Sequence, residues 1–198
     1  KMEYLKIEQF KYIVFNSSLD SRKNVRFLCE AFLRYKNKIS PDDDTKFVII
    51  GKLKYGEPWC FKLLDDYRHR DILFTDYVNE NEKFELFLNS LAFVCPSIVE
   101  GFGIPVLDAA SLGLPSIVSD IEPHKEISEI MDFYKYIDLV TLKHSYLWER
   151  KIQKIFQSYK EDSDEYYYQI KLERLRRFVK VNESLKNQFS SQIMSFLS

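Results

Sequence analysis

The chain has little cysteine and almost no net charge, and each of these shortages argues against a class of protein. Its formal net charge is −1 over 198 residues, whereas a nucleic-acid-binding domain usually carries a strong basic surplus. The 3 cysteines are scattered, and no CxxC pair indicates a zinc site or a disulfide framework, which favours a reducing, cytoplasmic compartment. No apolar run approaches the ~20 residues of a membrane-spanning helix, and no signal-peptide pattern opens the chain.

Hydrophobic residues nevertheless make up 45% of the sequence, enough for the core of one domain with an extension. Short apolar runs alternate with helical patterns, and the runs are nearly continuous in apolar residues rather than apolar at every second residue. This pattern predicts an α/β fold, with a doubly wound Rossmann-like parallel sheet of about six strands and helices on both faces. We expect strands over 12–17, 46–51, 71–77, 91–97, 115–120 and 135–140, and helices over 23–39, 58–69, 81–90, 104–112 and 123–131.

The sequence also suggests how the chain is divided. The start at Lys1, followed by Met2, looks like a cut, so we expect residues 1–11 to be a linker remnant from a missing N-terminal domain. Residues 12–145 form the predicted Rossmann-like domain. From about residue 145 onward the pattern is helical, which predicts a C-terminal helical extension over 146–198.

Three of the five glycines lie between Pro96 and Asp120, and two of them follow Glu100 in the run EGFGIPVLD. Glycine lets the backbone adopt positive φ and approach a ligand closely, and the helix predicted after Gly103 offers its N-terminus to an anion. In a sheet of order 3-2-1-4-5-6, the loops 16–24 and 97–103 would line one crevice at the carboxyl ends of the strands.

The charged residues of these loops suit a sugar diphosphate, although each has a plainer explanation. Arg22 and Lys23 would supply positive charge to a diphosphate, or form an ordinary solvated face. Asp108 would accept hydrogen bonds from ribose hydroxyls, or only complement the helix dipole. Glu100 would accept from the hydroxyls of a second sugar. The glycines alone are weak evidence, because glycine turns between strands and helices are common.

The run EGFGIPVLDAASLGLPSIVSD resembles the signature of family 4 glycosyltransferases, and SLDSRKNVRFLCEAF resembles their phosphate-binding stretch. The runs FVIIGK, FTDYVNENE and PSIVEGFG occur in the order and spacing of that family, so the resemblance covers residues 12–140. It implies the GT-B fold, in which two Rossmann-like domains flank the active site. This chain is similar to the C-terminal, donor-binding half.

The resemblance also implies a chemistry and a setting. We expect a retaining hexosyltransferase, possibly specific for mannose, that uses a nucleotide sugar such as a GDP- or UDP-hexose and needs no metal or other cofactor. The acceptor, a glycan or a lipid-linked sugar of cell-surface polysaccharide or glycolipid synthesis, would bind through the missing N-terminal domain. That half would also provide any peripheral association with the inner face of the membrane, and the isolated fragment would transfer little or no sugar.

Position by position, the resemblance implies that Lys23 binds the donor diphosphate and that Glu100 contacts the transferred sugar, which makes these two the expected catalytic residues. Asp108 stands where the family usually has glutamate, and it would bind the ribose. Ser17 and Ser18 stand where many members have glycine with an arginine nearby. The expected donor-binding residues are Ser18, Arg22, Lys23, Glu100, Gly101, Phe102, Gly103, Ile104, Pro105 and Asp108.

These departures keep a second function open, namely a non-catalytic GT-B half that acts as a binding or assembly module for a partner glycosyltransferase. A nucleotide-sugar epimerase is disfavoured by the Glu-Gly-Phe-Gly form. His124 either makes local hydrogen bonds at a helix start or contacts the donor. Cys95 fits a core position, Trp59 is a weak candidate for a nucleobase contact, and the tyrosines 166–168 would pack the helical extension.

Overall fold

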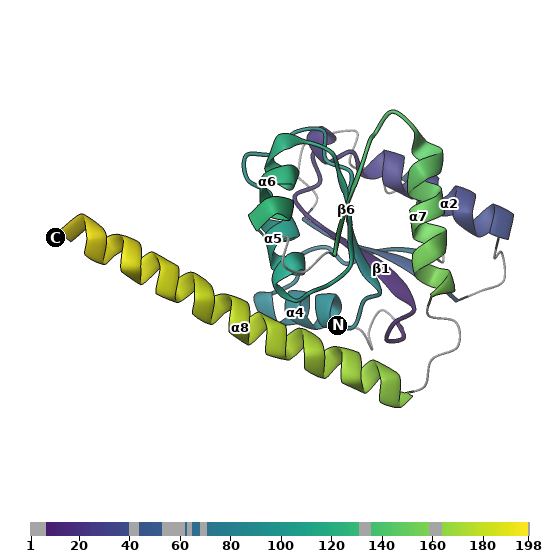
Figure 1. Cartoon of the computed structure of the whole chain (residues 1–198). Coiled ribbons are helices and arrows are strands. Elements are labelled where there is room, and N and C mark those ends of the chain that lie inside the picture. The colour runs from purple at the N-terminus through teal and green to yellow at the C-terminus, as the bar shows by residue number, and fades with distance from the viewer. Residues whose placement is uncertain are drawn as a thin grey trace.

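The computed structural model describes residues 7–39, 44–52, 62, 65–67, 71–130, 136–158 and 164–197, with side chains left out for residues 39 and 164 and for 185–197. Most of the helix expected over 58–69, including Trp59, lies outside the described residues. Within them, the chain forms one parallel sheet with helices on both faces and a long helix along one edge (Figure 1).

The sheet has six parallel strands in the order β3-β2-β1-β4-β5-β6, which confirms the doubly wound α/β prediction. The register places Val14 of β1 between Val48 of β2 and Phe93 of β4. All three side chains are fully buried, as expected for a sheet that is covered on both faces. The strands are β1 (Tyr12–Asn16), β2 (Lys46–Ile50), β3 (Ile72–Phe74), β4 (Ala92–Cys95), β5 (Ser116–Ser119) and β6 (Ile137–Val140).

Strand β3 is shorter than the expected 71–77. Asp76 has a φ of 58°, which an extended strand excludes, and the Thr75 hydroxyl donates to its carbonyl at 2.9 Å. The chain therefore turns directly after Phe74. The helix that follows, α4 (Glu80–Leu88), is capped by Asn79, because Asn79 and Glu82 form a reciprocal capping box.

Two hydrophobic cores lie on the two faces of the sheet. Alternate residues of β1 feed them, since Phe15 belongs to the first core and Val14 to the second. The first core is covered by α2 (Val25–Ile39) and α7 (Ser145–Gln157), whose Trp148 is fully buried there. The second core is covered by α4, α5 (Ile104–Ser111) and α6 (Glu122–Ile130). Figure 1 shows the two layers of helices on either side of the strands.

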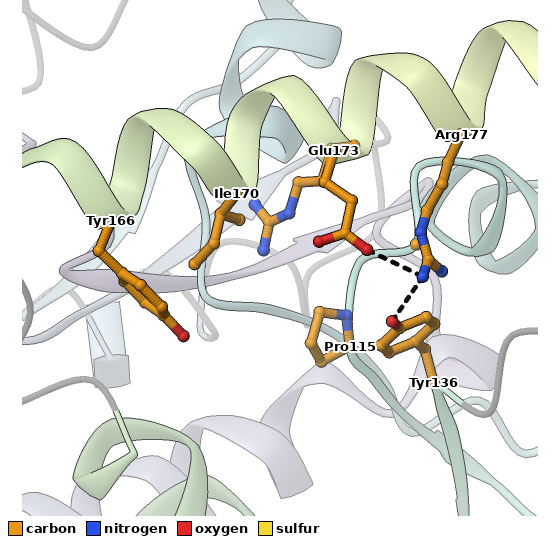
Figure 2. A pocket seen from close by; sticks show the side chains of 8 residues that line it. Pro115, Tyr136, Tyr166, Ile170, Glu173 and Arg177 are labelled. Atoms are coloured by element: carbon orange, nitrogen blue, oxygen red, sulfur yellow. Dashed lines mark hydrogen bonds and ion pairs between the residues drawn. The ribbon is translucent and has the colours of Figure 1, made fainter.

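Helix α8 (Asp164–Leu197) runs across the amino ends of the strands and then extends past the body of the domain (Figure 1). Tyr167, from the tyrosine run, stacks on Phe10 with ring centroids 4.5 Å apart. Arg177 lies over the Tyr136 ring at 4.5 Å and donates to the Tyr136 hydroxyl at 2.7 Å, as Figure 2 shows. Among the described residues, no helix is long and apolar enough to cross a membrane.

Candidate functional site

The loops after β1 and β4 meet at the carboxyl ends of the strands, as the predicted strand order requires. The amide of Ile98 donates to the carbonyl oxygen of Arg22 at 2.8 Å. A short 3-10 helix, η1 (Ser21–Lys23), forms the end of the first loop, and Asn24 closes it in the left-handed conformation with a φ of 53°. The backbone therefore holds the two distinctive loops of the sequence against each other.

Lys23 and Glu100 form an ion pair across these two loops. The Lys23 ammonium donates to Oε2 of Glu100 at 2.6 Å, and the two side chains are only 11% and 9% exposed. The hydroxyl of Ser97 donates to the other carboxylate oxygen at 2.7 Å. Both oxygens of Glu100 are thus held, so the two residues expected to be catalytic are together in a nearly buried position.

Arg22 and Ser18 both bind Asp20 instead of facing that pair. The Arg22 guanidinium donates to both Asp20 oxygens, at 3.1 and 3.0 Å, and its side chain is 64% exposed. The Ser18 hydroxyl donates to Asp20 at 3.1 Å. Burial alone would raise the pKa of Asp20, but the hydrogen bonds from Arg22 and Ser18 outweigh it and lower that pKa. A cluster centred on Asp20 therefore shapes the loop that carries Lys23.

The glycines of the second loop have different surroundings. Gly101 has open space on its side-chain face, whereas Gly103 is left-handed, with a φ of 93°, and lies against His124 and Ile127. Gly103 is the N-cap of α5, and Pro105 lies in the first turn. Four exposed apolar residues form a rim beside the helix start, namely Ile98, Val99, Phe102 and Ile104.

A chain of polar groups lies beneath this loop, and no motif in the sequence indicates it. The Ser119 hydroxyl donates to the Ser97 carbonyl at 2.5 Å. The Nδ1 atom of the fully buried His124 lies 2.9 Å from the Ser119 carbonyl, so this nitrogen carries the proton and donates. Burial lowers the pKa of His124, although the Ser119 carbonyl acts to raise it. The serines at the ends of apolar strands are the one sequence feature that could have indicated these polar groups.

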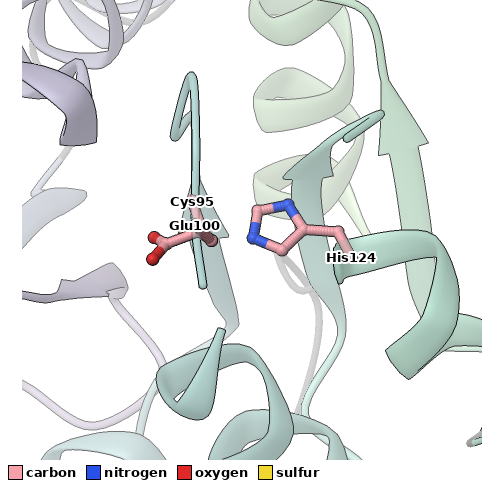
Figure 3. A group of neighbouring side chains, drawn as sticks. All are labelled: Cys95, Glu100 and His124. Atoms are coloured by element: carbon pink, nitrogen blue, oxygen red, sulfur yellow. The ribbon is translucent and has the colours of Figure 1, made fainter. Parts of the chain in front are cut away.

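His124 therefore makes the local hydrogen bonds of the plainer alternative, and its other nitrogen faces the site. Nε2 is buried and has no hydrogen-bond partner among the described residues. In Figure 3 this side of the ring points toward Cys95 and Glu100. Cys95 is 2% exposed, in agreement with the expected core position, and burial raises the pKa of its thiol to about 11.

Asp108 lies further along α5 and pairs with Lys83 of α4. The Lys83 ammonium reaches Asp108 at 3.1 Å and Glu80 at 2.6 Å. Burial acts to lower the pKa of Lys83, but these two carboxylates raise it overall. Asp108 and Lys83 flank a cavity of about 260 Å³ that has Phe84, Phe87 and Phe178 in its walls. Lys83 could not be predicted as part of the site, because no motif near it in the sequence indicates a contact with α5.

Comparison with known proteins identifies the protein family to which the chain belongs. Residues 1–130 match the family described as glycosyl transferases, group 1. The chain therefore belongs to that glycosyltransferase family, as the sequence motifs indicated.

Individual relatives are more distant and much longer. The chain is 32% identical over 120 residues to an uncharacterized glycosyltransferase of Methanocaldococcus jannaschii, covering 59% of this chain and 29% of that protein. It is 26% identical over 120 residues to O-antigen chain mannosyltransferase B of Escherichia coli, covering 59% and 30%. It is 32% identical over 97 residues to O-antigen chain mannosyltransferase RfbU of Salmonella typhimurium, covering 49% and 27%. The chain thus aligns with less than a third of each of these curated relatives.

Solved structures share the fold. WaaG, a glycosyltransferase involved in lipopolysaccharide biosynthesis, matches with a TM-score of 0.65 at 16% identity, over 89% of this chain and 45% of that one. Sucrose-phosphate synthase from Thermosynechococcus elongatus matches with a TM-score of 0.67 at 15% identity, over 98% and 48%. These identities carry the fold alone, and the fold is that of one part of GT-B glycosyltransferases.

Proposed function

We propose that this chain is the donor-binding half of a retaining, nucleotide-sugar-dependent glycosyltransferase of the family 4 type. The observation that carries the proposal is the nearly buried Lys23–Glu100 pair beside the start of α5. A cation, a carboxylate and a helix N-terminus at the carboxyl edge of a doubly wound sheet match the needs of a sugar diphosphate. The rim of Ile98, Val99, Phe102 and Ile104 is exposed, as suits a surface that faces a second domain.

The ion pair with Glu100 explains how Lys23 can stay charged in a nearly buried position before a diphosphate binds. A lone buried charge is costly, and Glu100 removes that cost with a bond of 2.6 Å. When the donor binds, Lys23 exchanges one carboxylate oxygen for the more highly charged diphosphate, and Glu100 becomes free to accept from a sugar hydroxyl. Lysine and the α5 dipole then stabilise the departing nucleoside diphosphate, which is electrostatic catalysis without a nucleophilic side chain and without a metal.

The proposed donor is a GDP- or UDP-hexose, and GDP-mannose is the first to test because two relatives are O-antigen mannosyltransferases. Asp108 is proposed to read the ribose hydroxyls, with Lys83 holding its carboxylate at 3.1 Å. The acceptor would be a growing cell-surface glycan or a lipid-linked sugar. It would bind through a second domain, in the cytoplasm, at the inner face of the membrane.

Calorimetric titration with GDP and UDP tests the donor half directly. We expect one of them to bind the 198-residue chain, and Lys23→Ala to weaken that binding by about 1.5–3 kcal/mol, roughly 10- to 150-fold. The matched control is Lys125→Ala, because Lys125 lies on α6 and forms an ion pair with the exposed Glu122. Folded protein that binds neither nucleotide at millimolar concentration would refute the proposal, and an unchanged affinity in Lys23→Ala would remove Lys23 from the site.

A second function is favoured by the family departures, namely a non-catalytic module that docks onto a partner glycosyltransferase. Asp108 is already paired with Lys83, and Ser18 with Asp20, so both are occupied within the chain. Sugar transfer by a longer chain that includes this domain would exclude the module. Nucleotide binding without transfer, in the presence of a suitable acceptor, would favour it.

A further inference from the structure

The polar groups beneath Gly103 include three that differ in chemistry and lie close together. The sulfur of Cys95, a carboxylate oxygen of Glu100 and a ring nitrogen of His124 all lie within 4.8 Å of one another. Figure 3 shows them converging from β4, the following loop and α6. Donor binding, as proposed above, uses only one of the three. Cys95 and His124 therefore need a separate explanation.

His124 supplies the observation that points to a ligand. Its Nδ1 is fixed as a donor to the Ser119 carbonyl at 2.9 Å, so Nε2 carries a lone pair. That lone pair is buried and has no partner among the described residues. Buried polar atoms are rarely left unpaired, because a hydrogen bond that is lost to water and not replaced destabilises the fold. Histidines that bind metals usually have this arrangement: one ring nitrogen donates to a backbone carbonyl or carboxylate, which orients the ring, and the other nitrogen binds the metal.

The donor set selects the kind of cation. Thiolate, imidazole and carboxylate together suit zinc and related divalent cations, whereas magnesium and calcium take oxygen ligands. With bonds of about 2.0–2.3 Å, ligand atoms around tetrahedral zinc are about 3.6 Å apart. The separations here are at most 4.8 Å, so each ligand would move by about 1 Å or less. Cysteine spacing, which gave no sign of a zinc site in the sequence, says nothing about residues that the fold brings together.

We propose that Cys95, Glu100 and His124 form a binding site for a zinc-like divalent cation. On binding, the Cys95 thiol releases its proton to solvent, and the sulfur, Nε2 of His124 and one Glu100 oxygen coordinate the cation, with water in the fourth position. The cation would occupy the carboxylate that is proposed to contact the sugar. It would then act as an inhibitor rather than a cofactor, a consequence that rests on the proposed function, whereas the binding itself does not.

Cobalt(II) is the probe, because a cobalt–thiolate bond absorbs light by charge transfer from sulfur. We expect one equivalent of cobalt to produce this band in the 198-residue chain, and zinc to abolish it by displacement. Cys95→Ser and Cys95→Ala should remove the band, and His124→Gln should weaken cobalt binding at least tenfold. The matched controls Cys29→Ser, Cys60→Ser and His144→Gln should change neither. Absence of the band at millimolar cobalt, or its survival in both Cys95 variants, overturns the site.

The inhibitory role has its own measurement in a longer chain that transfers sugar. Zinc should inhibit transfer by the parent and at least tenfold less strongly by Cys95→Ser, which keeps Lys23 and Glu100. Chelation of zinc by the donor is the same in both reactions and cancels. Equal inhibition of both proteins would overturn the inhibitory role. A failure of nucleotide binding would leave the cobalt result unaffected, so the two proposals fail separately.

Discussion

Arg174 and Lys23 are both nearly buried cations, but they lie at opposite edges of the sheet and bind different kinds of partner. At the amino edge, Arg174 of α8 donates to the backbone carbonyls of Leu88 and Ser90 at 2.6 and 2.7 Å. At the carboxyl edge, Lys23 binds the side chain of Glu100. Carbonyls belong to the fold and cannot leave, whereas a carboxylate can be exchanged for a ligand anion. The comparison indicates that one edge stabilises the fold and the other is prepared for binding.

The two ends of α5 repeat this contrast with glycine. Gly103 precedes the helix at the carboxyl edge and Gly113 follows it at the amino edge, and both are left-handed. A side-chain carbon added at Gly113 would lie 2.7 Å from Arg177, the residue that joins α8 to Tyr136. One added at Gly103 would lie 3.2 Å from Ile127 and 3.3 Å from the His124 ring. The same backbone conformation thus supports helix docking at one end and the candidate site at the other.

The largest expected effect is the loss of Arg174. In Arg174→Ala, two buried carbonyls lose charge-assisted hydrogen bonds, and we expect the free energy of unfolding to fall by about 3 kcal/mol. Urea denaturation followed by circular dichroism measures this, with the exposed Arg176→Ala as the control. Nucleotide affinity of the folded protein should stay the same. A large loss of affinity would show that the amino edge is coupled to the site and would break the comparison.

The two glycines give the sharper test, with an intermediate effect. Gly113→Ala and Gly103→Ala should each lower the free energy of unfolding by about 1–2 kcal/mol, because alanine is strained in the left-handed region. Gly103→Ala should in addition weaken GDP or UDP binding about fivefold, since it displaces the start of α5. Calorimetric titration of both variants with GDP and UDP measures whether only Gly103→Ala loses affinity. If the two lose affinity equally, the division between the edges is wrong.

The smallest expected effect concerns pH and the cluster around Asp20. The pKa of Asp20 in the folded protein is below its ordinary value of 3.8, so its ionised form stabilises the fold above that value and the contribution disappears as the pH falls through the lowered pKa. Asp20→Asn should therefore be less stable than the parent at pH 7, by less than about 1 kcal/mol. The difference should close below pH 3.8. A difference that stays constant with pH would contradict the assignment to Asp20.

Much of the fold could be predicted because strands such as β1 and β4 are apolar at consecutive positions, which is typical of a sheet covered on both faces. Their order was assumed as the common one for a doubly wound sheet, and the structure has that order. The shortening of β3 could not be predicted, since it depends on the left-handed Asp76. The course of α8 over the amino edge depends on contacts such as that of Arg174 with Leu88, 86 residues apart in sequence, and no local pattern encodes them.

The candidate site likewise contains residues that the sequence could predict and residues that it could not. Lys23 and Glu100 stood out because they lie in motifs, each readable within a few residues of chain. Ser97 and Ser119 did not, and their roles appear only where parallel strands end side by side, as the Ser119 bond to the Ser97 carbonyl shows. Likewise, only the short distance between Lys83 and Asp108 in the folded chain shows that Lys83 holds that carboxylate.

The sequence by itself therefore determined the class of fold, the two loops that matter and the family, because apolar periodicity, glycine and short motifs are local properties. Only the tertiary structure decided which side chains meet. It placed Lys23 on Glu100, left Nε2 of His124 without a partner among the described residues, and turned that atom toward Cys95. Such encounters depend on how strands and helices stack, and a contact across 77 positions has no signature within either segment.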